Sequence, residues 1–278
     1  MSAIPPHYNY ATQFGNFSSV PAAAVFAALY VPLFIVYTCK SFQKPGYVPI
    51  ISAIFSLIRI ITWILRALLL TGTNGENLVL FIVYVVFFGT GFSCLLFISF
   101  SYLNSAIATY PDHFSKVVIT RAGKIYHLVR AIIFVIIALG IWASTLTGRT
   151  SLDDTHKARV LSVTTTWLLW AVSVVCLLGS LVVAWSVRNV KHNGMAKTHL
   201  ALILSSIFIV VRCSFNVAGL YIVPNPTRNE ALFYVLNALM EFLALAVLAF
   251  IIFLARPKRE EEHPMVSEDQ AVGVQVFK

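Results

Sequence analysis

Charged residues are scarce in this chain. Only 11% of its 278 residues are Asp, Glu, Lys or Arg, whereas 59% are hydrophobic, and the mean hydropathy is +0.83. A typical soluble domain is about 25% charged and roughly 45–50% apolar. The composition therefore excludes an ordinary soluble domain and indicates an integral membrane protein, in the plasma membrane or an endomembrane, whose first partner is the lipid bilayer.

Several residue patterns that carry familiar chemistry are also missing. No cysteine lies in a predicted outer loop, and no CxxC or Cys/His spacing is present, so we expect no disulfide there, no metal and no cofactor. No lysine lies inside an apolar run, which excludes a retinal Schiff base. Because HExxH, GxSxG and paired-acid patterns are absent, the sequence does not favour an enzyme.

Long apolar runs, in contrast, fill most of the chain. Each run is about 20 residues long, enough to cross a ~30 Å hydrocarbon core at about 1.5 Å per residue. No alternating strand pattern competes with them. We therefore predict an all-α, seven-transmembrane-helix bundle with helices at 20–39, 47–70, 78–103, 125–147, 163–187, 199–223 and 231–255.

The loops predict the orientation of this bundle. Eleven Lys and Arg residues near the helix ends fall on one side and four on the other, which predicts an outside amino terminus and a cytoplasmic carboxy terminus. Asn16 begins an Asn-Phe-Ser glycosylation sequon in the predicted outer segment. We thus expect an extracellular segment (1–19), a membrane domain (20–255) and a disordered cytoplasmic tail (256–278). The net charge of +9 reflects this loop bias, so no nucleic-acid partner is expected.

The second apolar run, FSLIRIITWILRALLL at 55–70, contains two arginines. Ser56, Arg59, Trp63 and Arg66 follow steps of three and four, so they share one helix face that should point into the bundle. Arg66 is about one turn from the outer end and could snorkel to the headgroups. Arg59 lies roughly 16 Å from that end, near the bilayer midplane, where a lone charge is costly and a partner is required.

The sixth and seventh runs offer partners at the same depth. Arg212 and Glu241 both lie about 10 residues below the outer ends of their helices, and Glu241 is the only acid deep in a predicted span. Asn216 is one turn from Arg212, and Asn237 and Tyr234 follow on the face of Glu241. We therefore predict a polar layer near the midplane in which the arginines keep Glu241 ionised.

Two interpretations of this layer remain open. In the first, Arg212 and Glu241 form a structural brace, and Arg59 is satisfied by carbonyls or Asn side chains. In the second, three arginines against one glutamate leave two net positive charges that receive an anionic ligand. Arg66 would then capture its head at the outer boundary, Arg59 would hold it near the midplane, and Trp63 would pack on its apolar part.

Four short segments resemble a known family: Leu29–Pro32, Phe55–Ile60, Ile209–Arg212 and Met240–Phe242. In this order they are similar to a fungal family of seven-pass membrane proteins of unknown function, sometimes labelled receptor-like. The sixth and seventh runs are also similar to the plant seven-pass family exploited by tobamoviruses, and a weaker likeness links the chain to fungal lipid-translocating exporters. Phe215 stands where the fungal pattern is associated with Tyr, which puts a hydroxyl contact in doubt. The resemblance implies the topology and suggests signalling, but no ligand.

Three functions follow from these observations. The favoured one is a receptor-like sensor of a small anionic amphiphile, with a cytoplasmic signalling partner. The rival is a translocator of lipids or amphiphiles, which should have a cavity continuous between the leaflets or open to lipid. A terpene-cyclase-like enzyme with Glu241 as its acid is least favoured, because the flanking arginines would weaken that acid.

Overall fold

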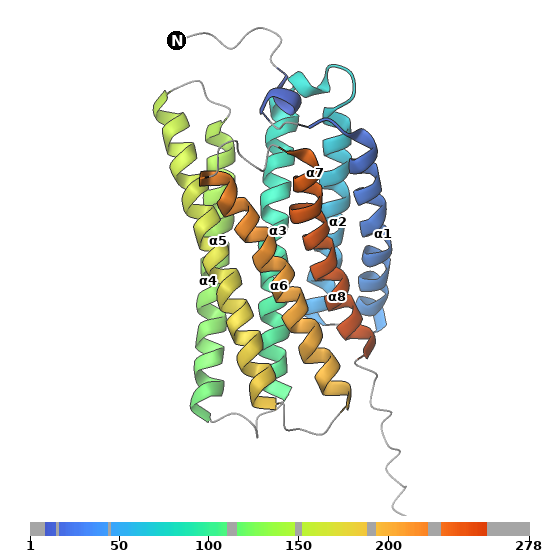
Figure 1. Ribbon diagram of the computed structural model, residues 1–278, viewed down its shortest axis with the longest axis vertical. Helices are drawn as coiled ribbons and strands as arrows, with labels where there is room; N and C mark the ends of the chain where they lie inside the picture. Colours follow the sequence, from blue (N-terminus) through green and yellow to red (C-terminus); the bar gives the residue numbers. More distant parts are fainter. Residues whose placement is uncertain are drawn as a thin grey trace, which may run out of the picture.

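The computed structural model describes residues 9–14, 17–43, 46–109, 116–147, 152–187, 193–221 and 229–254. Seven helical spans in these ranges are long and apolar enough to cross a membrane, and the described residues contain no strand (Figure 1). The spans are formed by α1 (Val20–Gln43), α2 (Tyr47–Leu69), α3 (Leu78–Thr109), α4 (Lys116–Thr147), α5 (Leu152–Val187), α6 (Asn193–Tyr221) and a seventh, composite helix. The predicted all-α, seven-helix class is confirmed.

The seventh span is not one regular helix. It begins with α7 (Glu230–Phe233), passes through a π-helical turn, η5 (Tyr234–Leu239), and ends as α8 (Met240–Leu254). Asn229 caps the start, because its side-chain oxygen accepts from the backbone N–H groups of Ala231 and Leu232. A π turn is rare and often lies at a functional site. Here it changes the helical register between Tyr234 and Glu241, which the sequence pattern had placed on a plain α-helix.

Three helices begin before the apolar runs that predicted them, since α4, α5 and α6 start six to eleven residues earlier. Helix α3 continues beyond its run to Thr109, a continuation that the sequence after residue 103 allowed. The reason is that hydropathy marks the edge of the hydrocarbon, whereas a helix can continue into water. The first turn of α5 shows this, because Asp153 and Asp154 favour a helix amino terminus and Asp153 pairs with Lys157 one turn later at 2.5 Å.

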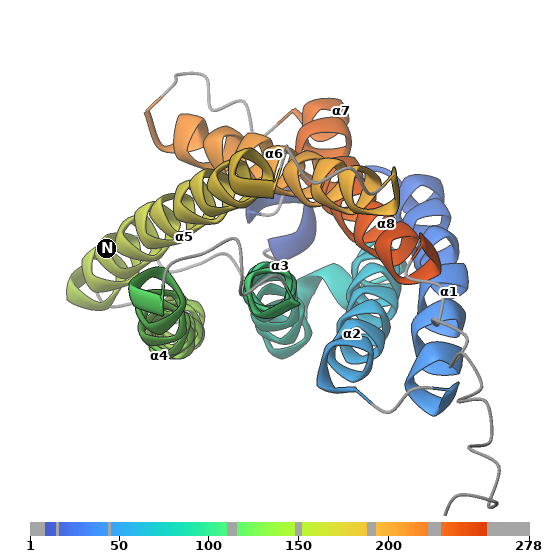
Figure 2. The same ribbon diagram turned by 90° about the horizontal axis from the view of Figure 1, so that it is seen from below.

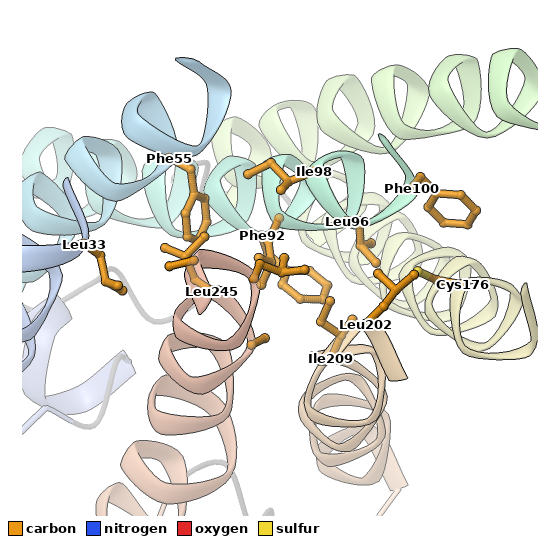
Figure 3. Packing of buried hydrophobic residues seen from close by; sticks show 14 of the residues in the cluster. Leu33, Phe55, Phe92, Leu96, Ile98, Phe100, Cys176, Leu202, Ile209 and Leu245 are labelled. Carbon is orange, nitrogen blue, oxygen red and sulfur yellow. The ribbon is translucent and has the colours of Figure 1, made fainter. Parts of the chain in front are cut away.

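The helices pack in two rows. Seen along the bundle, α4, α3 and α2 form one row and α5, α6 and α8 form a second row beside it, while α1 flanks α2 and α8 (Figure 2). Apolar side chains fill the space between the rows, among them Phe55, Phe92, Leu96, Ile209 and Leu245 (Figure 3). Many large apolar side chains instead point outward, with Phe42 85% and Trp185 68% exposed, as expected of a surface that faces lipid.

The amino-terminal segment packs on one end of the bundle, here called the N-terminal end (Figure 1, top). A short π-helical turn, η1 (Tyr10–Phe14), is followed by Phe17, whose backbone N–H donates to Ala11 O at 2.9 Å. Ala11 and Phe17 are buried against residues of α2 and α3. Seven spans place the end of α8 at the opposite, C-terminal end. Asn16 and the tail 256–278 lie outside the described residues, so glycosylation, tail disorder and outside-to-inside orientation stay predictions.

Candidate functional site

The polar layer predicted from the sequence is present. Ser56, Arg59, Trp63 and Arg66 form the buried face of α2, as their spacing predicted. Arg59, Arg212 from α6 and Glu241 from α8 meet inside the bundle, and each side chain is only 1–2% exposed. Together with Asn216 and Asn237, these three residues form what we call the central cluster.

Glu241 is the hub of the central cluster. Its Oε1 accepts a hydrogen bond from Arg59 Nε, and its Oε2 forms a salt bridge with Arg212 Nη2 at 3.0 Å. Arg59 Nη1 also donates to the backbone carbonyl of Phe88 at 3.0 Å. The expected pair between Arg212 and Glu241 is therefore present, and a carbonyl accepts from Arg59 as expected, but Glu241 also binds Arg59, which was not expected. Depth along a helix could not predict that one carboxylate reaches both arginines.

A chain of amides extends the cluster from Arg212. Arg212 Nε donates to Asn237 Oδ1 at 2.5 Å, and Asn237 Nδ2 donates to Asn216 Oδ1 at 3.0 Å. Asn237 lies within the π turn η5, so the irregular turn positions the amide that orients Arg212. Tyr30 of α1, which is 1% exposed, also interacts with the Glu241 carboxylate. Four helical spans thus converge on one ion-pair network.

Helix α3 supplies an aromatic wall that the sequence did not predict. The Cζ atoms of Arg59 and Arg212 lie 5.0 and 5.6 Å from the Phe88 ring centroid, and Arg212 Cζ is 3.8 Å from that of Phe92. Both guanidinium groups therefore make cation–π contacts, which favour a desolvated cation. Gly91 makes this approach possible, since a Cβ there would lie 2.9 Å from Arg59 Cζ.

Arg66 belongs to a second group of residues, the outer cluster, together with Tyr84, Tyr234 and Glu230. Its Nε donates to Tyr234 Oη at 3.2 Å, its Nη1 to Tyr84 Oη at 3.1 Å and its Nη2 to Glu230 Oε1 at 3.2 Å. Arg66 is 2% exposed, so it does not snorkel out of the protein as one interpretation expected. A dedicated acid and two phenols instead hold it inside.

The amino-terminal segment covers the outer cluster. The backbone N–H groups of Ser18 and Ser19 donate to Glu230 Oε1 at 3.1 and 3.2 Å, and the Ser18 hydroxyl donates to Glu230 Oε2. The Phe17 ring lies over the Arg66 guanidinium, with Cζ 3.9 Å from the ring centroid. The outer cluster is therefore closed by the protein's own chain.

Trp63 lies between the two clusters. Its ring stacks on Phe26 at a centroid distance of 5.0 Å and on Tyr234 at 5.8 Å, and it is 2% exposed. The predicted site residue Tyr234 thus has two roles, because it also accepts the hydrogen bond from Arg66. All eight predicted site residues lie in this connected network, but Arg66 and Tyr234 belong to the outer cluster and Trp63 separates the two.

The two clusters differ in net charge and in how many of their N–H donors have hydrogen-bond acceptors. Arg66 and Glu230 balance each other, and all three Arg66 nitrogens have acceptors. In the central cluster two arginines face one carboxylate, which leaves one net positive charge. Arg59 Nη2, Arg212 Nη1 and Trp63 Nε1 are buried N–H donors without a hydrogen-bond partner in the described part of the chain. Such unsatisfied donors are costly and uncommon in native interiors.

Glu230 is the main functional residue that the sequence analysis missed. It directly precedes the predicted run 231–255 and is the first residue of α7, directly after its cap Asn229. Counting residues from that cap places Glu230 at the N-terminal end of the seventh span, and Arg66 lies near the same end of α2. The sequence therefore contained enough information to predict the Arg66–Glu230 pair. Phe17, Tyr30 and Tyr84 had no such signal, because their roles depend on how the helices are rotated.

Within the described residues, no group of His, Cys, Asp and Glu could hold a metal ion. Ion pairs, amides and aromatic rings define the site. With its seven apolar spans, the protein is a seven-helix membrane protein with a buried, positively charged polar core. Residues 20–258 match the model of a family described as a domain of unknown function, DUF7702, and the chain belongs to that family. No curated protein matched the chain in a sequence search, and no solved structure matched it.

Proposed function

We propose that the protein is a receptor-like membrane sensor whose central cluster binds the head of a singly charged anionic amphiphile. The observation that carries this proposal is the set of unpartnered donors on Arg59, Arg212 and Trp63, in a cluster with one surplus positive charge. A carboxylate head would supply acceptors for these donors and would neutralise the cluster. A phosphate monoester, with a charge of about −1.5 to −2, would over-neutralise it.

In this proposal the anionic head of the ligand binds Arg59 and Arg212. Arg66 does not capture it first at the outer boundary, as the second interpretation of the sequence expected. All three nitrogens of Arg66 already have acceptors, and Phe17 covers its guanidinium. Trp63 keeps the role expected of it, because its ring and those of Phe26 and Tyr234 offer an apolar, stacked surface beside the cluster.

Signalling follows from the way the cluster joins the helices. Glu241 links α2 to α6 and α8, so a ligand that competes for either arginine would change the relative positions of these spans. Below the cluster, Tyr37 Oη donates to the backbone carbonyl of Leu245 at 3.0 Å, and Leu202, Leu248 and Ile251 are buried. This packed C-terminal half favours a sensor that acts on a cytoplasmic partner, as does the resemblance to receptor-like seven-pass proteins.

The test compares ligands that differ only in charge. Purified protein in a neutral detergent should gain several degrees in Tm with a long-chain fatty acid but not with the fatty alcohol of the same chain length. Trp63→Phe keeps the ring and removes one donor, so it should reduce the gain. Arg59→Gln should abolish it, and Arg59→Lys should retain part of it. Arg159→Gln, which removes an exposed arginine of α5, is the matched control and should leave the gain unchanged. Equal gains for acid and alcohol would refute the proposal.

A translocator is the second candidate, and one feature favours it. Leu200, Ala201, Leu204, Ala246, Val247 and Phe250 line an apolar groove of about 330 Å³ between α6 and α8. Leu200 and Phe250 are 57% and 55% exposed, so the groove opens toward lipid and could hold an acyl chain. Fluorescent lipid exchange between the leaflets of proteoliposomes separates the candidates, because a sensor should not accelerate it.

A further inference from the structure

A third group of polar side chains lies at the C-terminal end, where α2 and α4 begin. Tyr47 Oη of α2 is 2.9 Å from Ser101 Oγ of α3 and 2.6 Å from Tyr126 Oη of α4. Phe97 lies between the two tyrosines, with ring centroids 5.5 Å from Tyr47 and 6.4 Å from Tyr126. Helix α3 lies between α2 and α4 in their row (Figure 2), and its Phe97 and Ser101 side chains each contact both tyrosines.

Arg130 adds a positive charge to this group. Its Cζ lies 5.7 Å from the Phe97 ring centroid and 5.9 Å from that of Phe134. The side chain is exposed, and its neighbours Leu128 and Phe134 on α4 are 61% and 59% exposed. Arg130 also lies about seven residues, or roughly 10 Å, inside the apolar span that begins at Gly123. This arginine therefore faces the lipid and not the bundle interior.

The described part of the chain offers this end no negative charge. Its acidic residues lie at the N-terminal end or in the central cluster: Glu76, Asp153, Asp154, Glu230 and Glu241. A lipid-facing guanidinium at this depth is costly unless it reaches the interface or meets an anion. A lipid-facing side chain at that surface meets the phosphates of the lipid headgroups.

The hydroxyls of Tyr47, Ser101 and Tyr126 donate their hydrogen bonds within the protein, so only Arg130 in this group can donate to a ligand. Ser101 Oγ donates to the backbone carbonyl of Phe97 at 2.7 Å, so the two tyrosine protons must serve the contacts among Tyr47, Ser101 and Tyr126. No hydroxyl proton remains for a ligand. The triad therefore holds the two tyrosine side chains in place, and the guanidinium supplies the N–H donors that a phosphate requires.

We propose that Arg130 and this triad form a binding site for an anionic phospholipid in the leaflet at the C-terminal end. The phosphate binds the Arg130 guanidinium, and one acyl chain packs on Phe97 and Phe134. The hydroxyl triad positions Tyr47 and Tyr126 beside the glycerol region. This site is separate from the central cluster, and the proposal does not depend on the sensor function.

The experiment measures lipid binding to the full chain by native mass spectrometry. Delipidated protein in a neutral detergent is titrated with phosphatidylglycerol and with phosphatidylcholine of the same acyl chains. Wild type should prefer phosphatidylglycerol, and Arg130→Gln should weaken that lipid about fivefold, the factor typical of one basic residue at an anionic surface. Arg130→Lys should keep most of the preference, and Arg159→Gln, at the opposite end, should keep all of it.

Two further arms make the result decisive. Tyr126→Phe breaks the triad and should weaken phosphatidylglycerol and phosphatidylcholine by a similar factor, because the triad positions the tyrosines but donates nothing to the phosphate. Inorganic phosphate should not displace bound phosphatidylglycerol at millimolar concentration. Equal lipid affinities for wild type and Arg130→Gln, no preference over phosphatidylcholine, or displacement by phosphate would each overturn the proposal.

Discussion

Glu241→Gln is the substitution for which the structure gives the sharpest expectation. Gln keeps the size and the hydrogen-bonding capacity of the side chain but removes the counter-ion of both Arg59 and Arg212. Breaking a buried ion pair costs about 3–5 kcal/mol because it leaves an uncompensated charge. Here two cations that are 1% and 2% exposed lose the same carboxylate. We therefore expect a loss at the upper end of that range.

The opposite substitution, Arg59→Gln, should be milder. It leaves Arg212 paired one-to-one with Glu241, so the cluster becomes neutral and loses mainly the hydrogen bonds of one side chain, about 1–3 kcal/mol. Combining both substitutions should cost less than the sum of the two, with a coupling of about 1–3 kcal/mol, because the second change removes one of the charges that the first left bare.

SDS-induced unfolding in lipid–detergent bicelles, followed by tryptophan fluorescence, measures these free energies of unfolding. Asp153→Asn is the matched control, because it also removes a carboxylate from an ion pair, but the Asp153 side chain is 72% exposed. It should have no measurable effect. If Glu241→Gln were no more destabilising than Arg59→Gln, or if the two effects were additive, the bridging role of Glu241 would be refuted.

Three other expectations can be checked in the same system. Gly91→Ala should destabilise the protein by about 1–3 kcal/mol because its Cβ would meet the Arg59 guanidinium, whereas Gly89→Ala, with no atom within 4 Å, should be neutral or stabilising. Tyr37→Phe should cost about 1 kcal/mol of unfolding free energy, since it removes the hydrogen bond to Leu245 O. Glycosidase treatment should shift the mass of protein made in a eukaryotic host, and an amino-terminal tag should be protected from protease added to the cytosolic side of the membrane; an unglycosylated protein whose tag is accessible only from the cytosol would reverse the predicted topology.

The fold was largely predictable because bilayer thickness leaves few options. An apolar run of about 20 residues must be a helix in lipid, so counting runs gave seven spans that the structure confirms. The helix ends and the π turn at Tyr234–Leu239 were not predictable in the same way. Hydropathy does not register where a helix ends in water, and a π turn differs from an α turn by one residue that local composition does not reveal.

The sequence predicted how deep each site residue lies in the membrane, but not the direction in which its side chain points around the helix axis. Counting residues from the helix ends brought Arg59, Arg212 and Glu241 to one level, and the structure places them in contact. Helix rotation, which depends on all the neighbouring side chains, decides that Glu241 lies between the arginines and that Phe88 faces both of them. A one-dimensional pattern contains no direct information about that rotation.

The remaining contrast is between two arginines on the same face of α2. Arg66 has one acid, two phenols and an aromatic cover, so its charge is neutralised and each of its nitrogens is satisfied. Arg59 shares its acid with Arg212 and keeps an unpartnered nitrogen. A purely structural brace needs only the Arg212–Glu241 pair, because adding a second buried cation to a neutral pair costs desolvation without adding a counter-ion. The surplus charge is therefore the feature that a structural role leaves unexplained and that binding of a single anionic head would explain.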